Sequence, residues 1–158
     1  MCLLALFFRV VEDAPVVIGA NREEAYRRGG EPPRLHGGDW LRVRPLPPGL
    51  HVLTNGDAHD DRDARRTFVA GALGQEGYRY RTSADCVEVL RQLCGRHEPG
   101  EPPVCLRGDD RGTTSSTIIA LRPALAESVY LHAQGPPDRT PYEDYSELLR
   151  QMDAGDKK

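Results

Sequence analysis

Two apolar segments close to the N-terminus decide the fold: Cys2–Val11 (CLLALFFRVV) and Val16–Ala20 (VVIGA). The first is apolar at every position except Arg9, and the second carries no polar side chain. Continuous rather than alternating apolarity predicts strands that are buried on both faces. The four residues between them, Glu12–Pro15 (EDAP), are typical of a turn. The sequence therefore predicts a hairpin that opens the chain.

Beyond the hairpin, hydrophobic periodicity predicts a mixture of strands and helices. Strands are expected at Trp40–Arg44, Leu50–Thr54, Thr113–Leu121 and Ser128–Ala133. Helices are expected at Asp61–Leu73, at Ala84–Arg96 with Ser83 as N-cap, and from Thr140–Pro141 to Met152. Strands towards both ends with helices between them predict a layered α+β fold. We expect one domain over residues 1–152, followed by a polar tail at 153–158.

Composition narrows the class of protein. The chain has 158 residues, with 21 basic and 24 acidic side chains and a formal net charge of −3. This balance does not favour a nucleic-acid binder, which needs a basic face. No apolar run approaches the ~20 residues that span a bilayer. Nothing basic precedes the apolar start and Arg9 interrupts it, so a secretory signal is not expected. Four cysteines without a CxxC pair indicate reduced thiols and a cytoplasmic location.

Cys2 is the residue with the clearest chemical capability. A small second residue permits removal of the initiator Met, which leaves the Cys2 thiol beside its own α-amine. An unperturbed α-amine has a pKa of ~7.7–8, so near neutral pH it can accept the thiol proton. The same group can then protonate a leaving amine, by the logic of a Thr activated by its own amine. Amide hydrolysis through an acyl-thioester is the expected reaction; the alternative is that Cys2 is a small hydrophobic residue.

The second apolar segment leads into Asn21-Arg22-Glu23-Glu24. If the two hairpin strands pair, these residues emerge beside Cys2. Arg22 is then suited to hold the charge of a thiolate or to bind a substrate carboxylate, and either glutamate to orient the free amine. The alternative is that this charged run is a solvated strand end.

The chain resembles the NRDE family, also called the transport and Golgi organisation protein 2 family. The resemblance rests on Met-Cys before an apolar strand, on the Asn-Arg-Glu-Glu run, and on three later segments: Pro48–Asn55 (PGLHVLTN), Cys105–Ile119 and the stretch around Val129–Leu131. It implies an N-terminal-nucleophile hydrolase-like αββα sandwich, with two stacked antiparallel sheets between helical layers, here in a shortened form. It further implies that Cys2 is the nucleophile, with Arg22 and Glu23 beside it, Asn21 in the substrate site and Asn55 as an oxyanion-hole residue.

Two departures from the family pattern bear on activity. Glu23 stands where the motif has Asp, and a middle section of the family is absent between about Gly38 and Asp39. The first hypothesis is an N-terminal cysteine amidohydrolase that needs no cofactor or metal and acts on a small non-peptide C–N bond. The second is a non-catalytic carrier of a small molecule, since the family has been linked to haem and acyl lipids. A third is a family member without activity of its own. Missing strands would leave an exposed sheet edge, which favours pairing with a second copy.

Three other motifs favour structural interpretations. Cys94-Gly95-Arg96-His97 has a spacing that suits zinc, but no second ligand pair is visible, so the end of a helix is the better interpretation. His59-Asp60-Asp61 precedes several arginines and is interpreted as the start of a helix. Gly112–Thr117 (GTTSST) lacks the lysine of a phosphate loop and is interpreted as a strand.

Overall fold

The computed structural model describes residues 2–25, 45–54, 62–74 and 80–155. These residues form a mixed α+β fold around one six-stranded antiparallel sheet of order β3-β1-β2-β4-β5-β6. The strands are β1 (Leu3–Phe8), β2 (Val16–Ala25), β3 (Gly49–Leu53), β4 (Arg111–Leu121), β5 (Val129–Ala133) and β6 (Glu143–Asp144). The described helices are α1 (Ala64–Gly74), α2 (Ser83–Cys94) and α3 (Ser146–Gly155), with a 3₁₀ turn η1 (Leu125–Glu127) between β4 and β5.

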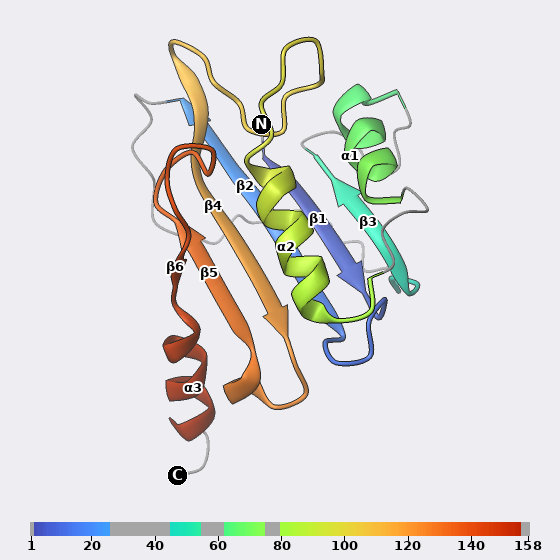
Figure 1. Cartoon of the computed structure of the whole chain (residues 1–158), viewed down its shortest axis with the longest axis vertical. Coiled ribbons are helices and arrows are strands. Elements are labelled where there is room, and N and C mark those ends of the chain that lie inside the picture. The colour runs from blue at the N-terminus through green and yellow to red at the C-terminus, as the bar shows by residue number, and fades with distance from the viewer. Residues whose placement is uncertain (1, 26–44, 55–61, 75–79, 156–158) are drawn as a thin grey trace, which may run out of the picture.

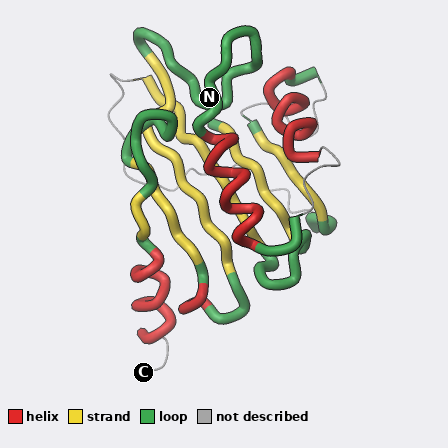
Figure 2. The backbone as a smooth tube through the Cα atoms, in the orientation of Figure 1, coloured by secondary structure: helices red, strands yellow, loops and turns green. Residues whose placement is uncertain are grey.

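Two of the helices cover one face of the sheet (Figure 1). Helix α2 crosses the middle of the sheet and contacts β2 and β4, whereas α1 contacts β3. Helix α3 lies at the other side of the molecule, where it contacts β5 and η1 (Figure 2). Among the described residues, no helix is both long and apolar enough to cross a membrane.

The predicted hairpin is present, as β1 and β2 pair from Leu3–Asn21 to Phe8–Val16. Burial alternates along β1: Leu3, Ala5 and Phe7 are at most 2% exposed beneath the helices, and the residues between them are only half-buried. Full burial is therefore found on one face of this strand. We call the other face, which is turned away from α1 and α2, the open face. It carries these half-buried or exposed apolar side chains: Leu4, Leu6, Phe8, Val16, Ile18, Leu53, Ile119 and Leu121.

Helix α2 approaches the sheet closely at Gly19. A Cβ atom added there would lie 3.0 Å from Leu90 Cδ2 and 3.2 Å from Leu90 Cβ. Leu90 is fully buried, so it packs directly on the backbone of β2. The absence of a side chain at this position sets the distance between the helix and the sheet.

Both ends of the first two helices differ from the sequence expectation by a few residues. Helix α1 begins at Ala64 rather than Asp61, because the carboxylate of Asp63 accepts the backbone N–H groups of Arg65 and Arg66 at 2.9 and 3.0 Å. The predicted N-cap Ser83 is wrong: Thr82 is the N-cap of α2, in a reciprocal capping box with Asp85.

The final helix starts later than predicted, at Ser146 instead of Thr140–Pro141. The residues before it pair with β5 as β6, and the backbone N–H of Tyr145 donates to the carbonyl oxygen of Tyr130 at 2.7 Å. Asp144 then accepts the N–H of Ser146 at 2.8 Å. The predicted strands at Leu50–Thr54, Thr113–Leu121 and Ser128–Ala133 correspond to β3, β4 and β5, and that at Trp40–Arg44 lies outside the described residues.

Because Leu90 leaves no room for a methyl group at Gly19, we expect Gly19→Ala to lower the free energy of unfolding by about 1–3 kcal/mol through overpacking. Gly71→Ala is the matched control, since Gly71 lies inside α1 with open space around its Cβ position. That change should raise stability by roughly 0.5–1 kcal/mol. Urea unfolding of both variants measures the difference. Equal effects of the two substitutions would contradict the close packing of α2 on β2.

Candidate active site

The structure places Cys2 immediately before β1, beside the end of β2. Leu3 pairs with Asn21, so the antiparallel register continued by one residue brings Cys2 level with Arg22. Both residues are exposed. Successive residues of a strand point to opposite faces, so Cys2 and Arg22 share the open face. The expectation that Arg22 emerges near the start of the first strand agrees with this register.

A β-bulge lies next to Arg22. On β4, Ser115 pairs with Arg22 and Thr113 with Glu23, so Thr114 is an extra residue without a partner of its own in the ladder. The hydroxyl of Thr114 donates to the carbonyl oxygen of Arg22 at 3.3 Å. Bulges of this kind bend a strand and re-aim side chains, and they are over-represented next to active sites.

Asn21 lies on the opposite face of β2 and is buried beneath α2, 1% exposed. Its Nδ2 atom donates to the carbonyl oxygens of Cys94 and Val104, at 2.9 Å each. Cys94 ends α2, and Val104 belongs to the segment that leads back to β4. The side chain therefore ties the C-terminal end of the helix and the following loop to the sheet.

Glu23 also points to the helix-covered face, where it forms a buried ion pair with Arg65 of α1. The Arg65 guanidinium donates in addition to the carbonyl oxygen of Val104 at 2.7 Å. Both charges are at most 8% exposed, so each depends on the other for compensation. Cys2 and Arg22 therefore lie on one face of the sheet, and Asn21 and Glu23 on the other. Sequence analysis missed Arg65, whose position 42 residues further along gives no local signal.

The other three cysteines are buried, whereas Cys2 is exposed. Burial raises the pKa of Cys86 to about 12. Burial also raises the pKa of Cys94 to about 11, although hydrogen bonds with Ser116 and Tyr142 act in the opposite direction. The pKa of Cys105 is raised by burial as well. Because the thiolate is the nucleophilic form, burial and the raised pKa both disfavour reaction at these three thiols.

Asn55, the expected oxyanion-hole residue, lies outside the described residues, as does Met1. His59-Asp60-Asp61 lies outside them too. Within the described part of the chain, no group of three or more His, Cys, Asp and Glu side chains is placed to hold a metal ion. His97, from the sequence motif with zinc-like spacing, has Nδ1 2.9 Å from the carbonyl oxygen of Cys105.

A cleft of about 480 Å³ lies between α1 and α2, on the helix-covered side. Apolar side chains supply much of its lining, and Arg96 and Glu101 supply charge. The Arg96 guanidinium donates to both carboxylate oxygens of Glu101 at 2.6 Å and lies 5.2 Å from the ring centroid of Phe68. The full lining is Thr67, Phe68, Gly71, Ala72, Leu73, Val89, Gln92, Leu93, Arg96 and Glu101. Cys2 is not part of it.

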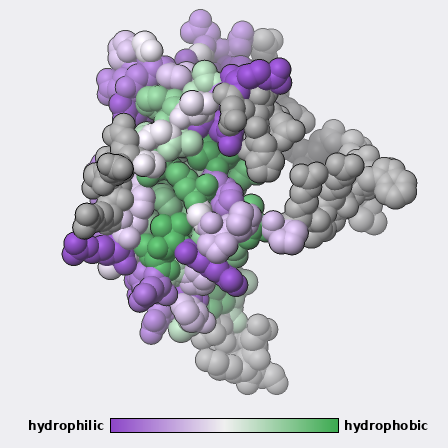
Figure 3. Space-filling view, turned by 90° about the vertical axis from the view of Figure 1, so that its right-hand side faces the viewer, coloured by the Kyte–Doolittle hydropathy of each residue, from purple (hydrophilic) through white to green (hydrophobic). Residues whose placement is uncertain are grey.

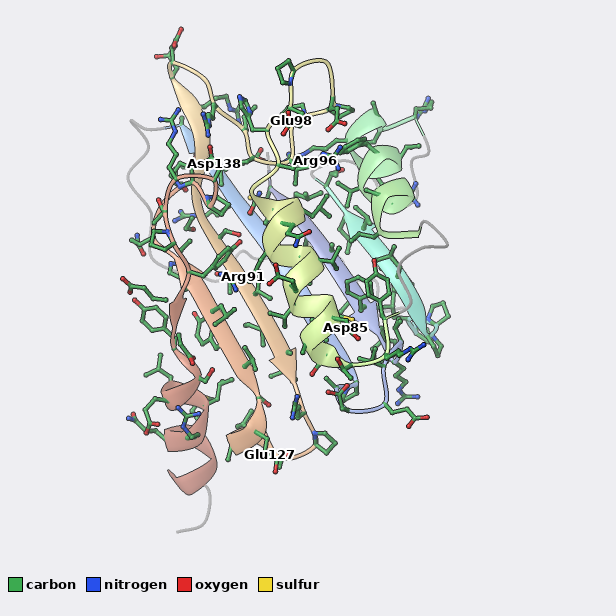
Figure 4. All side chains as sticks on the ribbon, viewed as in Figure 1. Asp85, Arg91, Arg96, Glu98, Glu127 and Asp138 are labelled. Atoms are coloured by element: carbon green, nitrogen blue, oxygen red, sulfur yellow. The ribbon has the colours of Figure 1, made fainter. Side chains whose placement is uncertain are left out.

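A second, polar hollow of about 560 Å³ surrounds the C-terminal end of α2 and shares Arg96 with the cleft. Arg96 and Glu98 from the loop after α2 and Asp138 from the loop after β5 gather there (Figure 4). Asp138 forms an ion pair with Arg107 and accepts a hydrogen bond from Cys105 Sγ at 3.3 Å. The Asp138 carboxylate thus links its own loop to the loop that contains Cys105 and Arg107.

Comparisons with protein-family models, curated proteins and solved structures found no match to this chain. The functional argument therefore rests on the residues and their geometry.

Because Glu23 compensates a buried arginine, we expect Glu23→Gln to lower the free energy of unfolding by about 3 kcal/mol. Asn21→Ala should lower the free energy of unfolding by roughly 2 kcal/mol, since two buried carbonyl oxygens lose their hydrogen-bond donor. The neighbouring Glu24→Gln is the control, and as a surface change it should stay within about 0.5 kcal/mol. Guanidinium unfolding measures all three, and the alkylation rate of Cys2 should not change in any of them. A changed alkylation rate of Cys2 in folded Glu23→Gln would contradict this expectation and would show that Glu23 influences the thiol.

Proposed function

We propose that the chain, after removal of Met1, is an N-terminal cysteine amidohydrolase that cleaves a small non-peptide C–N bond. The observation that carries this proposal is the contrast among the thiols. Cys2 is exposed at the start of a central strand, level with Arg22, while the other three cysteines are buried. One antiparallel sheet with helices on one face is what half of an αββα sandwich would have, and the β1–β2 register puts Cys2 on the other face.

In this mechanism the Cys2 sulfur attacks the carbonyl carbon of the substrate, and its proton passes to the α-amine. The resulting ammonium protonates the leaving nitrogen as the C–N bond breaks, which leaves an acyl-thioester on Cys2. Water, deprotonated by the amine, then hydrolyses the thioester and regenerates the thiol. Arg22 is placed on the same face to bind a substrate carboxylate or to stabilise negative charge. Asn21 and Glu23 hold the helices that support this strand.

The test begins with the intact mass of the purified protein, which should show loss of Met1. Brief treatment with iodoacetamide at neutral pH should add one label, and peptide mapping should place it on Cys2. With p-nitrophenyl acetate as acyl donor, the native protein should gain one acetyl group at residue 2, and Cys2→Ala should gain none there. Arg22→Ala should slow acylation, and Arg22→Lys should restore part of the rate.

Two outcomes would overturn the proposal. Retention of Met1 would leave Cys2 without a free α-amine and would remove the base. An acetyl group that forms with undiminished rate and stoichiometry in Cys2→Ala would show that another residue reacts.

The cleft between α1 and α2 favours a second candidate function, the binding of a small apolar molecule. Its volume is that of many small-molecule sites, and apolar side chains from both helices make up about half of its lining. An acyl chain fits this chemistry better than haem, since the described residues of the lining include no histidine, cysteine or methionine that could ligate iron.

A fluorescent fatty acid should then bind with one-to-one stoichiometry. Ala72→Trp, which fills the cleft from α1, should weaken binding at least about tenfold, the equivalent of 1.4 kcal/mol. Cys2→Ala should leave binding unchanged, which separates this activity from the hydrolase. Fluorescence titration provides the measurement. Equal binding by Ala72→Trp would show that the probe binds elsewhere.

A further inference from the structure

The open face carries a continuous apolar area across the centre of the sheet. Leu6 pairs with Ile18, and Ile18 pairs with Ile119, so these three side chains form a row across β1, β2 and β4. A second row contains Phe8 and Val16, and both rows are only half-buried. The area reaches the β3 edge at Leu53, which is 37% exposed. Figure 3 views the molecule from this edge, on the side of β3 and α1, and shows hydrophobic side chains between hydrophilic ones there.

This apolar composition is unusual for a sheet face that is exposed to solvent. An antiparallel sheet with one solvated face shows alternation of apolar and polar residues along its strands. By contrast, β1 (LLALFF) is apolar at all six positions, although α1 and α2 pack on one face only. Of the described helices, α3 contacts β5 and η1 instead of the strands at the centre of the sheet. The sequence of β1 therefore specifies a cover on the second face.

Carboxylate and guanidinium groups on the described part of the open face lie at its margins, and the polar side chains of Thr117 and His132 are hydrogen-bonded to each other at 2.9 Å on β4 and β5. Arg22 and Glu24 follow the point where β2 runs past the end of β1, and Glu143 belongs to the last strand of the sheet. A partner must accordingly be apolar over the centre and extended enough to match a sheet.

We propose that the open face packs against the open face of a second copy of this chain. Two sheets stack face to face about 10 Å apart when both inner faces are apolar. The described part of the chain carries one such face, and an isologous dimer brings it against the same face of the second copy. The result is a dimer with its two sheets in the middle and the α1–α2 layers outside.

The size of the face agrees with a dimer that dissociates. Five strands spaced roughly 4.8 Å apart, each with about six residues at ~3.4 Å per residue, give a footprint of roughly 500 Å² per copy. Two copies then bury on the order of 1,000 Å², the lower limit for a specific interface. The proposal does not depend on the hydrolase chemistry, because it follows from the centre of the sheet and not from Cys2.

The test is the mass of the full-length protein by sedimentation velocity from about 1 to 500 μM, a range that covers the affinities of small interfaces. We expect a concentration-dependent shift from monomer to dimer. Leu53→Lys introduces a charge on the open face at a position that tolerates solvent, and the change occurs twice in the dimer. The dissociation constant should therefore rise about a hundredfold. Leu6→Glu, at the centre of the face, should give a monomer.

The matched control is Leu148→Lys on α3, where Leu148 is 47% exposed and lies outside the open face. This variant should dimerise like the original protein. Circular dichroism checks that each variant is folded, and Leu53→Lys keeps the test decisive should Leu6→Glu fail to fold. A protein that is monomeric at every concentration would overturn the proposal. The same holds if the monomer binds a lipid probe on its open face, since the partner would then not be a second copy. A Leu53→Lys dimer of unchanged affinity would also overturn it.

Discussion

The alternation of side chains along β2 is the constraint on which the rest of the structure depends. This strand lies between β1 and β4, so every second residue must face the helices and the others must face away. Asn21 and Glu23 are thereby committed to the buried side, and Arg22 to the side of Cys2. The run Asn21–Glu24 thus has two roles: two of its side chains hold the helices, and Arg22 lies on the face of Cys2. A shift of the register by one residue would bury Arg22 and expose both structural side chains.

Helix α2 is held to the sheet at both ends by polar contacts and at its centre by packing. At its N-terminal end, Asp13 in the β1–β2 turn accepts the backbone N–H and the hydroxyl of Ser83 at 2.8 and 2.7 Å. These hydrogen bonds lower the pKa of Asp13. At the other end, Asn21 holds the last carbonyl group of the helix. Between them, Leu90 packs on Gly19. Turn, strand and helix are consequently fixed as one unit.

Local sequence patterns predicted the elements better than their connections. The apolar hairpin, β4 and β5 follow from runs of apolar and β-branched residues that need no distant partner. The capping box at Thr82 was also visible in the sequence, as Thr-Ser-Ala-Asp, although Ser83 was the predicted cap. The start of α3 was not visible in the sequence. The strand before it, β6, forms only through pairing with β5, which fixes Tyr145 to Tyr130.

For the site, the sequence indicated which residues lie near one another but not which way they point. The hairpin pattern was sufficient to bring Arg22 beside Cys2. The face taken by Glu23 depends on Arg65, and that pairing has no signature in either segment. Burial of this ion pair commits the Glu23 carboxylate to the helix-covered face, where its partner is an arginine of α1. The orientation of this carboxylate therefore reflects the packing of α1 on the sheet, and Arg22 is the residue of the run Asn21–Glu24 that lies level with Cys2 on the open face.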